Sequence, residues 1–121
     1  MATNSNWTII FEDKCIIKNT GAESGTGYKI DDDAFWNDSK FSNIWAIQYG
    51  TSNSSDEVEH RDDTPHCSLA DEGIDIQQFV TRWDAVHLTH LQGEWDADNV
   101  EGESESDKIA RLGPRPTSYS S

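Results

Sequence analysis

The chain has 121 residues, of which 23 are acidic and nine are basic, so its formal net charge at pH 7 is −14. A surface this acidic is repelled by nucleic acid and by anionic lipid, and we expect neither as a partner. No apolar run approaches the roughly 18 residues of a transmembrane helix, and residues 1–6 lack the apolar region of a signal peptide, so the sequence predicts neither a membrane span nor secretion.

The size of the chain fits one domain with appendages, because domains usually contain about 100–150 residues. Apolar residues make up only 34% of the chain, but it has five Trp, four Phe and three Tyr. Each of these aromatic side chains can bury roughly 150–250 Å², which is enough for one modest core. Two cysteines, Cys15 and Cys67, are too few for a disulfide framework, and we expect both to be reduced.

The first third of the chain predicts β-structure. Residues 7–11 and 15–18 are short runs rich in Ile, Phe and Trp, and they read as the two strands of a hairpin. A loop rich in Gly, Ser and Thr follows at 19–27, and a short third strand at 28–30. Residues 31–36 predict one helical turn, with its acidic residues at the positive end of the helix dipole.

Residues 43–49 are the clearest strand in the sequence. If the strand alternates strictly, its two faces are Ile44, Ala46 and Gln48, and Trp45, Ile47 and Tyr49. A turn at 50–55 then leads into a returning partner at 57–60, whose outward charges are typical of an edge strand. The strands between about residues 6 and 60 therefore predict a small, mainly antiparallel sheet.

A helix from about residue 75 to 92 carries three start signals. Asp75 is a good N-cap, Gln78 completes a capping box, and Ile74 and Phe79 match a hydrophobic staple. The apolar stripe expected to face the sheet is Ile76, Phe79, Val80, Trp83 and Leu91. Gly93 is expected to end or weaken the helix, because glycine in a helix interior costs about 1 kcal/mol.

The last quarter of the sequence divides by charge. Residues 96–107 alternate acids with small residues and predict a linker that buries too little apolar surface to become ordered. Residues 108–121 contain three basic residues and no acid, and the Pro-containing stretch after residue 112 favours an extended path. The expected organisation is an acidic α+β domain at 1–95, the linker at 96–107, and a detached cationic docking tail at 108–121.

Two groups of side chains have the residue types of metal ligands. His87 and His90 share a helix face with Glu94, but Gly93 disturbs the helix at that point, and a pair of hydrogen-bonded histidines is the favoured interpretation. His60, His66 and Cys67 stand near Asp62 and Asp63. Their spacing matches no structural zinc motif, so incidental loop residues are the favoured interpretation. Metal binding by either group is left open, and we expect no cofactor.

The other motifs in the chain are weak. The acids at 31–33 lack the alternate spacing and the glycine of a calcium loop, and helix capping explains them better. The glycine-rich loop at 21–27 has neither the lysine nor the following helix of a phosphate cradle. With no nucleophile elbow and no paired cysteines, the sequence predicts a protein that is not an enzyme.

Aromatic residues exceed what a core of this size needs, and tryptophan and tyrosine are favoured anchors at interfaces. We therefore expect contacts with partners through the helix and through the tail. The predicted partner-binding residues are Trp83 and Trp95 on the helix, and Ile109, Arg111, Leu112, Arg115 and Tyr119 on the tail.

The strand Ile-Trp-Ala-Ile-Gln-Tyr-Gly at 44–50 turns back through Glu-Val-Glu at 57–59 into the Asp-Asp-Thr-Pro loop at 62–65. This pattern resembles one found in small proteins of tailed bacteriophages. The start at 6–13 and the ending at 108–119 are similar to proteins of marine phages, cyanophages in particular. Members of this group occur among virion structural and tail-fibre-region proteins, and their motifs carry no catalytic residues to transfer.

The resemblance implies a non-enzymatic virion structural or accessory protein that makes contacts between subunits, in the tail or tail-fibre region rather than the capsid. Its partners would be other phage structural proteins, and its place the virion, after assembly in the host cytoplasm. An assembly chaperone absent from the mature particle is one alternative. An acidic inhibitor that mimics DNA and acts on a host protein is another. The oligomeric state is left open.

Overall fold

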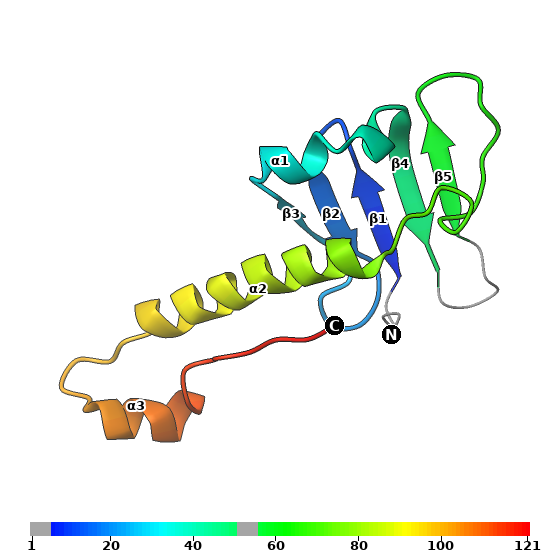
Figure 1. The fold of residues 1–121 in the computed structure, drawn as a ribbon. Helices are drawn as coiled ribbons and strands as arrows, with labels where there is room; N and C mark the ends of the chain where they lie inside the picture. Colours follow the sequence, from blue (N-terminus) through cyan, green and yellow to red (C-terminus); the bar gives the residue numbers. More distant parts are fainter. Residues whose placement is uncertain (1–5, 51–55) are drawn as a thin grey trace.

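The computed structural model describes residues 6–50 and 56–121, and it has a five-stranded antiparallel sheet with one long helix across it (Figure 1). The strands are β1 (Trp7–Ile10), β2 (Cys15–Lys18), β3 (Thr26–Lys29), β4 (Ile44–Tyr49) and β5 (Glu57–His60). The helices are α1 (Asp33–Trp36), the 3-10 turn η1 (Ser39–Phe41), α2 (Gln77–Ala97) and α3 (Glu105–Leu112). The α+β class with a mainly antiparallel sheet is confirmed. Most of the turn expected at 50–55 lies outside the described residues.

The sheet order is β3-β2-β1-β4-β5, so β1 of the predicted hairpin is the central strand and β2 lies next to it. Its turn places Lys14 at a φ of 54°, a left-handed conformation that non-glycine residues rarely adopt. The third strand begins earlier than expected, at Thr26, because Gly27 pairs with Ile17. A Cβ on Gly27 would lie 2.9 Å from the Ile17 side chain, so this close approach requires glycine.

Strict alternation along β4 is wrong. A bulge lies between Ile44 and Ala46, where Trp45 is the extra residue opposite β5. The bulge reverses the phase of the strand, so Ile44 joins Ile47 in the core cluster and Trp45 is exposed. The sequence pattern could not place Ile44 and Ile47 on the same face, because strict alternation puts two residues that are three positions apart on opposite faces of a strand.

The helix α2 begins at Gln77, close to the predicted start, but its N-cap is Ile76 rather than Asp75, and Asp75 and Gln78 do not form the expected capping box. The Asp75 carboxylate accepts a hydrogen bond from the Gln77 backbone at 2.9 Å, and the Gln78 side chain donates to the Asp75 carbonyl at 3.0 Å. The expectation that Gly93 ends the helix is wrong, since α2 continues to Ala97. The indole of Trp95 donates to the Gly113 carbonyl at 3.0 Å, and this contact beyond Gly93 offsets the cost of the glycine.

The core is aromatic and lies between α2 and the sheet. Phe79 of α2 lies within 6.4 Å, ring centre to ring centre, of four aromatic rings from the strand connections, Phe11, Phe35, Trp36 and Phe41. One turn further along, Trp83 meets Trp7 of β1 edge to face at 5.3 Å. The predicted stripe is therefore correct near its start, whereas Leu91 is only half-buried.

Replacing Phe79 by alanine should reduce the free energy of unfolding by about 3–5 kcal/mol, because it leaves a cavity in the core and removes contacts with four aromatic rings. Denaturant unfolding followed by tryptophan fluorescence measures this change. Thr89→Ala is the control on the same helix, since Thr89 is exposed. That control should change stability by less than about 0.5 kcal/mol. Equal losses in the two variants would contradict the central place of Phe79.

Candidate functional site

The C-terminal arm, residues 98–121, returns along α2 toward the sheet (Figure 1). The Arg111 guanidinium binds the Glu103 carboxylate at 2.8 Å and the Asp98 carboxylate at 3.0 Å. Arg115 binds Asp96 at 2.8 Å. Hydrogen bonds from these guanidinium groups lower the pKa of the Glu103 and Asp96 carboxyl groups. The acids of the expected linker are thus the partners of the cations of the expected tail.

The arm therefore differs from the disordered linker and detached tail that the sequence predicts. The helix α3 crosses the expected boundary between residues 107 and 108, and the Ser104 hydroxyl caps it by accepting from the Asp107 backbone at 3.1 Å. Lys108 is buried, with its ammonium 2.6 Å from the side-chain oxygen Oδ1 of Asn99 and 4.0 Å from the centre of the Trp95 ring. Composition misses this order because the stabilising pairs are formed between the two segments.

The end of the arm is anchored on the sheet and on α2. The Lys18 ammonium donates to the Tyr119 hydroxyl at 3.0 Å, and that hydroxyl donates to the Glu23 carboxylate. Burial lowers the pKa of Lys18, but the hydrogen bonds to Tyr119 and Glu23 outweigh burial and leave the pKa raised. The Ser121 backbone donates to the Asp84 carboxylate at 3.0 Å. These contacts define the tail anchor, made by Tyr119 and Ser121.

His87 lies between the tail anchor and the core. Its ring stacks on Trp83 at 4.6 Å, meets the Tyr119 ring at 4.5 Å, and its Nδ1 lies 2.7 Å from the Tyr28 hydroxyl. The buried, hydrogen-bonded state expected for the two helix histidines applies to His87. His90 is instead exposed and lies 3.6 Å from Glu94.

The predicted partner-binding residues separate into four groups. Trp83 has no exposed surface, so its assignment to a partner contact is wrong: it is a core residue. Trp95 and Tyr119 are half-buried and hold the arm in place. Arg111 and Arg115 form internal ion pairs, which leaves Ile109 and Leu112 as the exposed apolar side chains of the set. Sequence reasoning missed Lys18, Glu23 and Tyr28, because no local pattern links them to a residue a hundred positions away.

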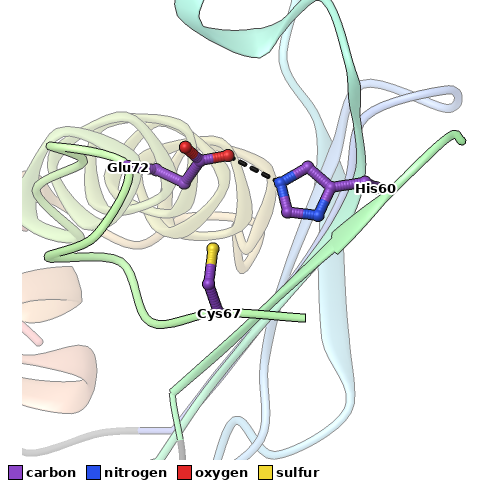
Figure 2. A group of neighbouring side chains, drawn as sticks. All are labelled: His60, Cys67 and Glu72. Carbon is purple, nitrogen blue, oxygen red and sulfur yellow. Dashed lines mark hydrogen bonds and ion pairs between the residues drawn. The ribbon is translucent and has the colours of Figure 1, made fainter. Parts of the chain in front are cut away.

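A second group of chemically active side chains lies at the other edge of the sheet, where His60, Cys67 and Glu72 converge (Figure 2). The Nε2 atom of His60 lies 2.6 Å from the Glu72 carboxylate, and one donor atom from each of the three residues lies within 4.8 Å of the other two. Cys67 is held there by an antiparallel bridge to Val58 of β5. The structure therefore replaces His66 of the expected group by Glu72, since His66 is exposed and pairs with Glu57.

The surroundings of Cys67 oppose a role as a nucleophile. Burial and the charges of Glu72 and Asp71 raise the pKa of the Cys67 thiol. A catalytic cysteine needs the opposite shift, because the thiolate is the reactive form. The three donors instead have the chemical types that a borderline-soft metal ion prefers.

Comparison of the chain with protein-family models, with curated proteins and with solved structures gives no match. In the part of the chain that the structure describes, no helix is both long enough and apolar enough to span a membrane.

Replacing Tyr119 by phenylalanine should reduce the free energy of unfolding by about 1–3 kcal/mol, because Lys18 and Glu23 lose a hydroxyl partner in a largely buried place while the ring contacts remain. Denaturant unfolding measures the loss. Ser118→Ala, at an exposed position of the same segment, is the control and should be neutral. A neutral Tyr119→Phe would show that the hydroxyl does not hold the arm.

Stability should fall as the solution is acidified through the titration of His87. Burial, with smaller contributions from His90 and Lys18, lowers the pKa of His87 below its ordinary value of 6.5, whereas Glu23 and Asp84 oppose the shift. The folded state favours the neutral ring, so this stability is fully present above pH 6.5 and is lost as the pH falls through the lower folded pKa.

Melting temperature against pH tests the assignment. His87→Gln should flatten the acid side of the profile, because the amide does not titrate. His90→Gln is the matched control one turn away, and it should retain the slope of the wild type. If the slope disappeared in the His90 variant and remained in the His87 variant, His90 would be responsible for the pH dependence and the prediction would be wrong.

Proposed function

We propose that the protein is a non-enzymatic structural or accessory protein of a tailed phage particle, located in the tail or tail-fibre region, that contacts neighbouring subunits through the outer face of α3. One observation supports the choice of this surface. Of the four large apolar side chains that are exposed in the described residues, Val100, Ile109 and Leu112 lie in the C-terminal arm, and only Trp45 lies on the sheet.

The outer face of α3 is suited to a contact because it is apolar and fixed in place. Ile109 and Leu112 stand three residues apart and so share one side of the helix. Lys108 and Arg111 occupy the adjacent side and bind residues before α3. The internal bonds hold α3 before any partner arrives, which reduces the entropy lost on binding.

The chemistry of this face indicates the kind of subunit that would cover it. Glu105 and Asp107 lie in the first turn of α3 and are exposed, and the chain as a whole carries −14. The complementary surface is an apolar groove with basic residues at its rim, because opposite charges at a rim steer association and fix its register. Contact by an ordered apolar helix replaces the flexible cationic docking expected from the sequence.

The double substitution Ile109→Glu and Leu112→Glu should reduce incorporation of the protein into particles by about tenfold or more, because each buried carboxylate would lack a partner at the interface. Quantitative mass spectrometry of purified particles, from phage that carry the variant, measures incorporation. Circular dichroism of the isolated variant should be unchanged, since both side chains are exposed.

The control is Trp45→Gln, which removes an exposed apolar side chain from the sheet and should leave incorporation unchanged. Wild-type particles that lack the protein altogether would overturn the virion role. If the protein then co-purified with unassembled tail subunits, it would act as an assembly chaperone. Salt-sensitive binding to a host enzyme of nucleic-acid metabolism would instead support a DNA mimic.

A further inference from the structure

His60, Cys67 and Glu72 lie close together but come from three different segments of the chain. His60 ends β5, Cys67 lies on the strand-like segment beside it, and Glu72 lies in the turn that leads to α2. Figure 2 shows the three side chains pointing toward a common space between the edge of the sheet and this turn. Backbone hydrogen bonds fix Cys67, since Val58 donates to its carbonyl at 2.7 Å and Cys67 donates back at 3.4 Å.

The imidazole of His60 is buried, with 4% of its side chain exposed, and this makes its bonding state informative. Its Nε2 atom meets Glu72, whereas Nδ1 has no hydrogen-bond partner among the residues that the structure describes. Buried polar nitrogens are almost always bonded, and an unsatisfied one is costly. The nitrogen that faces Glu72 and Cys67 is Nε2, so Nε2 is the imidazole donor of the group, and Nδ1 lies on the far side of the ring (Figure 2).

The charges of the donors also suit a divalent ion, since the sulfur of Cys67 and a carboxylate oxygen of Glu72 lie within 4.8 Å of each other. A divalent ion would balance one thiolate and one carboxylate, and the neutral imidazole would add no charge. The resulting site has no net charge, which favours its formation at a partly buried position.

We propose that His60, Cys67 and Glu72 bind one zinc ion, with water in the fourth position. Nitrogen, sulfur and carboxylate oxygen are the three donor types that zinc accepts in tetrahedral sites. Binding forms a zinc–sulfur bond and releases the thiol proton of Cys67 to solvent. The ion would cross-link the segment between β5 and α2, so its role is to stabilise that connection. The site lies away from the arm and does not depend on the phage assignment.

Two measurements on the untagged full-length protein test the site, after chelation and with a phosphine reductant that does not bind zinc strongly. Cobalt(II) serves as a spectroscopic probe and should give a thiolate-to-cobalt absorption band that saturates at one equivalent. Zinc should remove this band by displacing cobalt. A moderate excess of zinc should raise the melting temperature of the chelated protein by roughly 5 °C or more.

Variants assign the ligands. Cys67→Ser should abolish the cobalt band and the zinc-dependent rise in melting temperature, and His60→Gln and Glu72→Gln should weaken binding by about tenfold or more. Cys15→Ser and His66→Gln are matched controls, because Cys15 lies on β2 and His66 pairs with Glu57. Both controls should bind like the wild type. The melting temperature of each variant is also compared with that of the wild type in the presence of chelator. Equal values show that the variant is folded and has lost only its ability to bind the metal.

Three results would overturn the proposal: no cobalt band in the wild type, a band that survives Cys67→Ser, or a band that depends on Cys15 or His66. Zinc uptake without a thiolate band would show that the many surface carboxylates bind the ion unspecifically. That outcome also counts against the site.

Discussion

The packing around Trp83 is the interaction on which the rest of the structure depends. Its indole donates to the Thr26 carbonyl at 3.1 Å, and its ring meets Trp7, Tyr28, His87 and Tyr119. The Lys18 ammonium lies 5.3 Å from the ring centre. The sheet, the long helix and the end of the chain therefore meet at one side chain. A small domain with few aliphatic residues obtains its core in this way, because one tryptophan buries the area of several smaller side chains.

The C-terminal arm is likewise held by a side chain that several segments share, but through charge rather than apolar contact. Its cations face the acids that precede α3, and Arg111 reaches two carboxylates at once. Isolated surface ion pairs contribute little, but a network that shares one guanidinium restrains several segments together. The basic residues of α3, Lys108 and Arg111, are bonded within the chain, whereas its apolar residues Ile109 and Leu112 are exposed. The same pairing leaves little of the positive charge in the arm free to attract an acidic partner.

The sequence predicts those parts of the fold that depend on neighbours along the chain. The hairpin, the return strand and the approximate start of α2 follow from period-two runs and from the signals at Asp75 and Gln78. The bulge at Trp45 and the continuation of α2 past Gly93 do not, because pairing with β5 and the contact between Trp95 and Gly113 decide them. The grouping of His60, His66 and Cys67 changes for the same reason: Glu72, rather than His66, lies beside His60 and Cys67, and no spacing rule indicates this neighbour.

The backbone bridge between Val58 and Cys67 also affects how copies of the chain meet. A sheet ending in a bare strand exposes backbone groups that can recruit a strand from another molecule, and this is a common route to aggregation. At Val58 both backbone groups are occupied by Cys67, and the side chains of Glu57 and Glu59 on either side carry negative charge. An incoming strand would have to displace the segment around Cys67 and approach two carboxylates. Both features oppose growth of the sheet by strand addition at β5, and the shortness of the strand, four residues, acts in the same direction.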